Sequence, residues 1–231
     1  LQQITKRIRP LEKQEDEIWD FGRPFKLYYN IKKMDRFYTL DPKTNPNFEK
    51  VFGKDFGALS TIGDGSCFFH SVTSAIFPGY DQLTRSKQQE AGHQLRLKFM
   101  KKMNQQLYHK VLERLRQKQK NKPFERYSYE TFKQKMNNTK RWADLVVIST
   151  VSLLLRLNIL FYDQVGNQFY GGVDENKHYL KKYPTIFILW QDRSHFELIV
   201  RHKNSTLERQ FHYHKHKALL DRIINFYNKN G

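Results

Sequence analysis

The single cysteine of the chain, Cys67, lies where its surroundings could activate it as a nucleophile. It follows Thr-Ile-Gly-Asp-Gly-Ser at residues 61–66 and opens a segment whose apolar residues recur every three and four positions, as in a helix. Backbone N–H groups at a helix N-terminus are unpaired and favour negative charge, which can lower the pKa of a thiol. With those of Gly65 and Ser66, they could hold the oxyanion of a tetrahedral intermediate, and Gly63 and Gly65 let a substrate backbone approach. The pattern predicts a nucleophilic cysteine beside an oxyanion loop; the alternative is an inert, buried thiol.

A nucleophilic cysteine needs a base, and His195 is the best placed of the nine histidines. It begins an apolar strand directly after the turn Gln-Asp-Arg-Ser. Alternate residues of a strand share a face, so His195 and Glu197 should point the same way, with Cα atoms about 6–7 Å apart. The Glu197 carboxylate can accept the second ring N–H and fix the tautomer of the imidazole. We therefore expect His195 to be the general base and Glu197 its orienting acid.

A mixture of helices and strands must position these side chains. Periodicity and turn residues predict helices over 67–76, within 81–120, over 142–155 and over 218–227, and strands over 25–29, 159–162, 168–170, 185–190 and 195–200. The continuous apolar run at 185–190 is typical of a central strand. This order predicts an α/β or α+β fold in which a small central sheet packs between helices.

Composition limits the class of protein. With 231 residues, of which 39% are apolar and 15% aromatic, the chain can bury the core of one domain, or of one domain with an extension. No run approaches the roughly 20 apolar residues that span a membrane, and the first residues show no signal peptide. One cysteine excludes a disulfide within the chain and any zinc site that needs two thiolates, and it suits a reducing compartment.

The chain is strongly basic, with 41 Lys and Arg against 23 Asp and Glu and a formal net charge of +18. Residues 85–126 hold 13 basic and 3 acidic side chains, and the resulting net charge of +10 is more than half of the positive surplus of the whole chain. A polyanion could bind this segment through phosphate contacts, with Tyr108 and Phe124 available for stacking. We slightly favour a second interpretation, in which the basic residues form a solvated helical face. A third interpretation is that the segment faces an acidic partner.

Further histidines could serve as metal ligands. His212, His214 and His216 alternate with Tyr and Lys, so all three would share a face of a strand. Adjacent lysines disfavour a cation, and we expect a basic, exposed linker there. His70 comes three residues after Cys67, and we favour a histidine packed on the helix over a site residue. The sequence thus predicts no metal site and no cofactor.

Three blocks of this sequence resemble the ovarian-tumour (OTU) family of cysteine proteases. The first is Gly-Asp-Gly-Ser-Cys-Phe-Phe-His-Ser at residues 63–71, which is similar to the nucleophile motif of the family. The second is Trp-Ala-Asp at 142–144, an apolar helix and the strand 159–162. The third is Trp190 followed by His-Phe-Glu-Leu-Ile at 195–199. The blocks occur in family order over roughly residues 57–201. The resemblance implies a papain-like α/β fold and hydrolysis of the isopeptide bond between the C-terminal glycine of ubiquitin, or of a related modifier, and a lysine.

The resemblance also implies roles for individual residues. Cys67 matches the nucleophile and His195 the general base, while Asp64 matches the Asp three residues before the nucleophile that shapes the oxyanion loop. The family places Asp or Asn two residues after the histidine, where this chain has Glu197, one methylene longer than Asp. Either Glu197 or Asp64 could therefore do the orienting.

These observations divide the chain into an N-terminal extension or subdomain at 1–57, an OTU-like catalytic core at 58–201 and a basic linker with a closing helix at 202–231. The expected partners are ubiquitin or a ubiquitin-like modifier and its conjugates, and no membrane. Family members of this type are intracellular and many are viral, so we expect a cytoplasmic location, or host cytoplasm or virion for a viral protein. The alternative function is an OTU-like binding module without turnover, which docks nucleic acid or an acidic protein through its basic helices.

Overall fold

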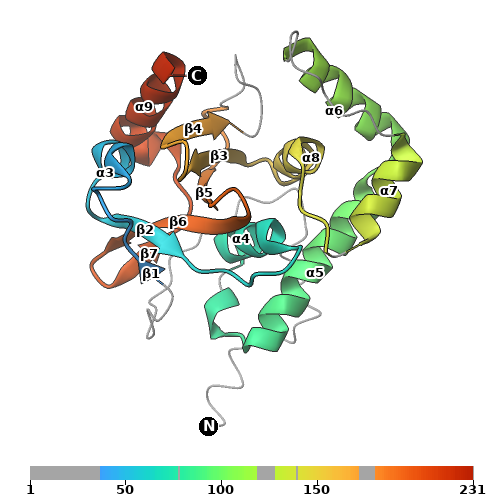
Figure 1. Ribbon diagram of the computed structural model, residues 1–231, viewed down its shortest axis with the longest axis horizontal. Helices are drawn as coiled ribbons and strands as arrows, with labels where there is room; N and C mark the ends of the chain where they lie inside the picture. The colour runs from blue at the N-terminus through green and yellow to red at the C-terminus, as the bar shows by residue number, and fades with distance from the viewer. Residues whose placement is uncertain (1–36, 78, 119–127, 139, 172–179, 231) are drawn as a thin grey trace.

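A computed structural model of the chain describes residues 37–77, 79–118, 128–138, 140–171 and 180–230 (Figure 1). They form a mixed α/β fold around a seven-stranded sheet with the order β1-β2-β6-β5-β3-β4, in which β7 also pairs with β6. The strands are β1 (Phe37–Tyr38), β2 (Phe56–Leu59), β3 (Asn158–Asp163), β4 (Gln168–Gly171), β5 (Thr185–Gln191), β6 (His195–Lys203) and β7 (Thr206–Glu208). The predicted fold class is confirmed, as is the central position of the apolar strand β5.

Helices cover both faces of this sheet. Figure 1 shows α3 (Pro46–Phe52) and α9 (Tyr213–Asn230) on one side, and α4 (Cys67–Ile76), α5 (Arg85–Lys102) and α8 (Leu145–Leu155) on the other. Two apolar clusters fill the layers between sheet and helices, one centred on Phe52, Phe187 and Phe211 and one on Phe68, Phe161 and Phe196. Apolar burial on both faces explains why β5 reads as a continuous apolar run.

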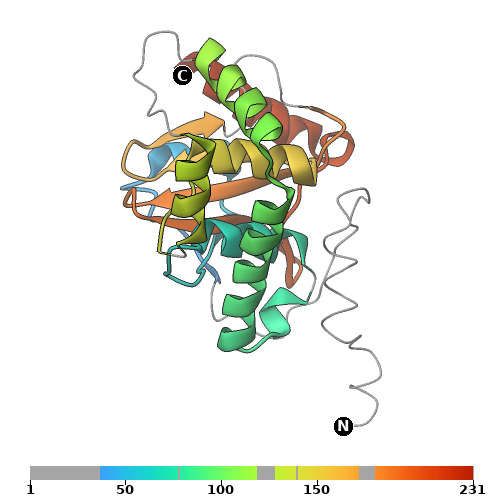
Figure 2. The ribbon, with the colours of Figure 1, turned by 90° about the vertical axis from the view of Figure 1, so that its right-hand side faces the viewer.

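The basic segment forms two helices, α5 and α6 (Gln105–Lys118), that follow one another along one side of the molecule beside α7 (Tyr129–Asn137) (Figure 2). The periodicity of this segment predicts an apolar stripe at every fourth residue from Leu95 to Leu115. It is buried at Leu95, Phe99, Met103, Val111 and Leu115, and Leu107 is half-buried. Tyr108 is buried as well, with 1% of its surface exposed, so the prediction that it could stack on a base is wrong. Its ring packs on Phe132 of α7, which the sequence did not reveal as a helix. Phe124 lies outside the described residues.

Local capping decides where the helices next to the site begin. The helix predicted over 67–76 is confirmed at both ends as α4. The helix predicted over 142–155 begins later, at Leu145, because the Asp144 side chain accepts a hydrogen bond of 3.0 Å from Val147 N. Trp142 therefore lies outside α8, with 51% of its surface exposed.

Both ends of the described chain contribute to the sheet and its cover. The elements β1, α3 and β2 arise from residues that carried no recognisable chemistry in the sequence, and α9 packs against α3. The division into 1–57, 58–201 and 202–231 stays a prediction; β2 crosses its first boundary and β6 its second. The strand predicted over 25–29 lies outside the described residues. No helix in the described ranges is both long and apolar enough to cross a membrane.

Candidate active site

Cys67 is the first residue of α4, and α4 is tied to the start of β6, where His195 lies. The Ser71 hydroxyl lies 3.0 Å from both the Cys67 and the Phe196 carbonyl oxygens. The Thr61 hydroxyl donates to the same Phe196 oxygen at 2.6 Å. A Cβ atom added to Gly63 would lie 4.0 Å from His195 Cε1, so the imidazole packs against the predicted oxyanion loop. The structure thus places His195 against the Gly-rich loop and ties Cys67 to the residue that follows His195.

The Cys67 thiol differs from the expectation in its protonation. Burial raises its pKa above the ordinary value, although the N–H groups of Phe196 and Phe68 act in the opposite direction, and Asp64 raises it further. Only 2% of Cys67 is exposed. Loss of hydration of the thiolate therefore outweighs the helix N-terminus, and the resting side chain is a thiol that must give up its proton to a base.

Glu197 lies beside the imidazole as the strand periodicity predicts. Its Oε1 lies 3.7 Å from His195 Nε2, and Thr61 Oγ1 lies 3.4 Å from the same nitrogen. Because Nε2 faces these two groups, Nδ1 is the ring nitrogen left to exchange a proton with a thiol. Glu197 is 4% exposed, and its Oε2 accepts a hydrogen bond from the Tyr38 hydroxyl.

The turn before His195 is fixed by an ion pair. Asp192 and Arg193 both adopt left-handed backbone conformations, with φ of 48° and 52°. The buried Asp163 carboxylate at the end of β3 accepts hydrogen bonds from Arg193 Nε and Nη2 at 3.2 and 3.0 Å. A non-glycine residue in this conformation is strained, so the ion pair helps to hold the turn that sets the register of β6.

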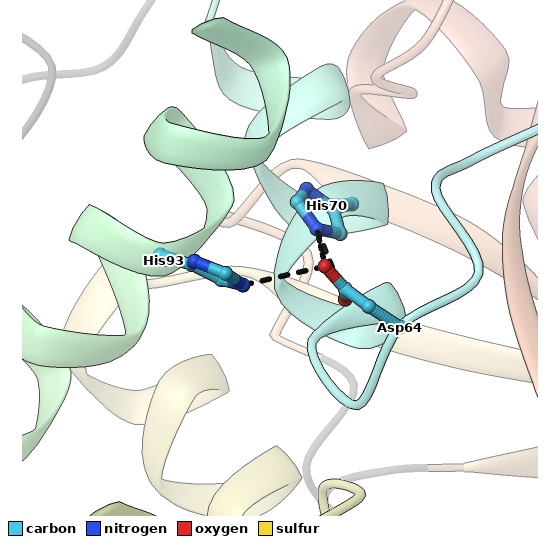
Figure 3. A group of neighbouring side chains, drawn as sticks. All are labelled: Asp64, His70 and His93. Atoms are coloured by element: carbon cyan, nitrogen blue, oxygen red, sulfur yellow. Dashed lines mark hydrogen bonds and ion pairs between the residues drawn. The ribbon is translucent and has the colours of Figure 1, made fainter. Parts of the chain in front are cut away.

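Asp64 is the centre of a polar cluster in the loop before Cys67 (Figure 3). Ser66 N donates to its Oδ1 at 2.7 Å, and His70 Nε2 lies 3.2 Å from both carboxylate oxygens. His93 Nε2 of α5 lies 3.3 Å from Oδ2. Burial favours a raised pKa for Asp64, but His70, the Ser66 N–H and His93 outweigh it and hold the pKa below its usual value. Asp64 is therefore a carboxylate that fixes the loop before Cys67.

His70 is buried and neutral in this cluster. Burial lowers its pKa despite the nearby Asp64 carboxylate. Its Nδ1 lies 3.3 Å from the Tyr80 hydroxyl, so a ring with its proton on Nε2 satisfies both contacts. Gly92 makes room for the ring, because a Cβ atom at that position would lie 2.1 Å from His70 Nδ1. His70 is thus packed on the helix, as predicted, and also touches the site.

The donor atoms of Asp64, His70 and His93 lie within 4.8 Å of one another, the one such grouping in the described part of the chain. One carboxylate and two imidazoles would suit Zn²⁺. The contacts above satisfy Asp64 and His70 without a cation, however, whereas His93 Nε2 makes no hydrogen bond. The buried Arg96 guanidinium also interacts with the Asp64 charge and would repel one.

Arg96 joins the Gly-rich loop before Cys67 to the loop before α8. It is 1% exposed, and its Nη1 donates to the Gly65 and Arg141 carbonyl oxygens at 3.0 and 2.9 Å. Nε and Nη2 donate to the carbonyl oxygens of Met136 and Asn138 at 2.9 and 2.6 Å. The planar guanidinium satisfies carbonyl groups of both loops at once, which a lysine cannot do.

The histidines near the C-terminus are not an exposed linker. His212, His214 and His216 lie just before or within α9, which begins at Tyr213 and is kinked at His216. His216 is buried, and its Nε2 lies 2.7 Å from Glu208 Oε1. The expectation of an exposed linker is wrong because β7 brings Glu208 against the start of the helix, where it pairs with His216.

Sequence reasoning missed four residues that contact the site: Tyr38, Thr61, His93 and Arg96. No local motif marks Tyr38, because its partner Glu197 is 159 positions away. The sequence offered a weak signal for Arg96. It directly follows Leu95, a residue of the apolar stripe of α5, and so lies next to the buried face of the helix.

Comparison with known proteins places this geometry in a family. A family model described as OTU-like cysteine protease matches residues 62–196. A search of curated protein sequences gave no match. Among solved structures, an OTU domain in complex with ubiquitin shares 18% identity, over 76% of this chain and 88% of its own, with a TM-score of 0.46. The viral OTU protease of Qalyub virus shares 17% over 63% and 84%, with a TM-score of 0.41. The Hazara virus OTU bound to ubiquitin shares 15% over 74% and 92%, with a TM-score of 0.38.

The family match covers more than half of the chain, and it contains both Cys67 and His195. The chain therefore belongs to the OTU-like cysteine protease family, as its sequence blocks predicted.

Proposed function

We propose that this protein is a deubiquitinase that hydrolyses the isopeptide bond between the C-terminal glycine of ubiquitin, or of a related modifier, and a lysine amine. The observation that carries the proposal is that Ser71 joins the carbonyl oxygen of Cys67 to that of Phe196, the residue after His195, within the stretch that matches the family. Ubiquitin is the modifier in two of the structures named above, and it is the substrate that we propose to test first.

The proposed reaction proceeds by nucleophilic catalysis. His195 Nδ1 takes the proton of Cys67, and the sulfur attacks the isopeptide carbonyl while the oxyanion faces the N–H groups of the Gly65–Cys67 loop. The C–N bond then breaks, and the imidazolium gives its proton to the leaving lysine amine. Water adds to the thioester and gives a proton to His195. The C–S bond breaks, and the proton returns to the thiolate to restore the thiol.

The test is covalent labelling together with turnover. A ubiquitin with a C-terminal propargyl or vinyl electrophile should add to Cys67, and because this is the one cysteine in the sequence, intact mass reports a single site. Cys67→Ala should lose labelling and cleavage of a ubiquitin–fluorophore amide, with an unchanged circular dichroism spectrum. Turnover by Cys67→Ala would refute thiol catalysis. A panel of differently linked di-ubiquitins would then define linkage preference.

The same experiment separates the alternative interpretation, a binding module without turnover. Such a module would bind ubiquitin or a polyanion but leave Cys67 unlabelled and the amide intact. A partner for the basic helices, a viral source and a cytoplasmic site of action remain predictions from the sequence.

A further inference from the structure

Glu197 receives a hydrogen bond from a residue that precedes the stretch matching the family. The Tyr38 hydroxyl donates to Glu197 Oε2, while Glu197 Oε1 is the oxygen that lies 3.7 Å from His195 Nε2. Tyr38 belongs to β1, and the family match begins at residue 62. One carboxylate oxygen of Glu197 thus contacts a tyrosine of β1, and the other lies beside the candidate base.

The sheet is built so that Tyr38 can reach Glu197. Tyr38 is opposite Ala58 in β2, and Ala58 is opposite Ile199 in β6, so these residues and Glu197 share a face. The residue of β2 between Tyr38 and β6 on this face is the fully buried Ala58, whose side chain is one methyl group. On the other face, a Cβ atom at Gly57 would lie 2.2 Å from the Tyr38 carbonyl oxygen, so glycine lets β1 approach closely. Small residues in β2 therefore bring a tyrosine within reach of a strand that it does not pair with.

Tyr38 acts as a hydrogen-bond donor over the whole range in which an enzyme works. Burial and then the Glu197 carboxylate raise its pKa above the ordinary value, so the hydroxyl keeps its proton. Glu197 is buried and has one more rotatable bond than the Asp that the family commonly uses. A longer side chain loses more conformational entropy when it is fixed, so a second contact is needed to hold it.

We propose that Tyr38 is a positioning residue, which holds the Glu197 carboxylate in the orientation that supports the His195 imidazole. This inference rests on the proposed cysteine-protease function. It extends the candidate site to a residue before the family match. It also identifies the hydrogen bond that holds Glu197, whose side chain is longer than that of Asp.

Tyr38→Phe removes the hydroxyl and keeps the ring. We expect kcat on a ubiquitin–fluorophore amide to fall about 10-fold, the loss of one charge-assisted hydrogen bond, with KM and melting temperature little changed. Tyr213→Phe is the matched control, since the Tyr213 hydroxyl also donates to a carboxylate, Asp221 Oδ1 at 2.9 Å, in α9. The control should keep wild-type kcat. A Tyr38→Phe enzyme with wild-type kcat would overturn the proposal.

A double-mutant cycle shows whether Tyr38 acts through Glu197. Tyr38→Phe should have no further effect in a Glu197→Ala background, and Glu197→Leu gives a second background if the alanine variant does not fold. An equal loss in the presence and absence of Glu197 would mean that Tyr38 acts elsewhere and would overturn the proposal.

Alkylation of Cys67 by iodoacetamide at pH 7 gives a readout that needs no ubiquitin. The rate of alkylation follows the small thiolate fraction of Cys67, which we expect the His195 ring, oriented by Glu197, to increase. Tyr38→Phe should therefore slow alkylation in the wild-type but not in the Glu197→Ala background. If Tyr38→Phe slows alkylation only when Glu197 is present, but the wild-type protein does not cleave ubiquitin substrates, the proposed substrate is wrong and the positioning role stands. If alkylation is unaffected by Tyr38→Phe, the positioning role is wrong.

Discussion

At the scale of single residues, Cys67 shows two opposing effects. A helix N-terminus favours the thiolate, whereas burial removes the water that a thiolate needs, and burial dominates here. The candidate nucleophile is therefore held as a thiol, and in the proposed mechanism it needs His195 to remove its proton. This explains why a sequence argument from the helix position alone gives the wrong direction for the pKa.

The raised pKa of Cys67 has a measurable pH dependence. A thiol whose pKa is above its ordinary value is protonated at neutral pH, so its alkylation by iodoacetamide should accelerate steadily from pH 7 to pH 9 as the thiolate fraction grows. The second-order rate constant, followed by intact mass, measures this. A rate that is already constant below pH 7 would mean that the thiolate predominates in the resting protein.

His195 and Glu197 should differ in their contributions to turnover. His195→Ala should approach the loss of Cys67→Ala, since the base is removed. Glu197→Gln should cost roughly 10-fold in kcat/KM, about 1.4 kcal/mol, because the amide oxygen can still accept the imidazole N–H. Parallel kcat/KM values for the three variants on one substrate make the comparison, with folding checked by circular dichroism. A Glu197→Gln enzyme as inactive as Cys67→Ala would make the negative charge indispensable.

At the scale of elements, the packing of α4 on α5 fixes the loop that carries Asp64. His70 projects from α4 into the space left by Gly92 of α5, and from there it reaches Asp64. The sequence predicted α4 at both ends because a Gly-rich turn and a helical period mark it. It did not predict the His70–Asp64 contact as a feature of the site, because the ring is oriented by a glycine on another helix.

Gly92→Ala should therefore destabilise the protein, although alanine is favoured over glycine inside a helix by about 1 kcal/mol. The new Cβ atom would meet the His70 ring and force it away from Asp64. We expect a loss of about 1–3 kcal/mol in the free energy of unfolding, measured with urea, and a fall in kcat.

A second substitution tests the cause of that loss. His70→Ala empties the space, so the double variant should be more stable than the sum of the single effects allows. Strict additivity would place the strain somewhere other than the His70–Gly92 contact.

At the scale of the whole molecule, the sequence predicted those elements that a local pattern of consecutive residues marks. The central strand β5 and the strand that begins at His195 were predicted because apolar runs and turns mark them. The strands β1 and β2 at one end of the sheet were not predicted, because β1 has two residues and β2 has four and neither shows an alternating pattern. The short helix α3 between them was not predicted either. For the same reason, the Tyr38–Glu197 contact could be found only once the strands were assembled.

His93 and Arg96 of α5 contact the loop before Cys67, and the apolar residues of the basic helices are buried in the core, but Lys101, Lys102 and Arg116 are exposed. Charge reversal of the exposed Lys101, Lys102 and Arg116 should leave kcat on a minimal ubiquitin substrate within a few fold. The same variants should weaken any polyanion binding, with a smaller salt dependence. Steady-state kinetics and titration with a labelled oligonucleotide measure the two effects. A collapse of kcat in a folded variant would place the chemistry near these helices.

The hydrogen bond from Tyr38 to Glu197 joins positions 159 apart in the chain, and this spacing has a consequence for biosynthesis. At a translation rate of about 5–20 residues per second, roughly 8–30 s pass between the addition of the two residues to the nascent chain. Cys67 leaves the ribosome well before His195, so a growing chain carries its thiol without the base that would activate it. Proteolytic chemistry would then begin only after β6 has emerged and closed the sheet against β2.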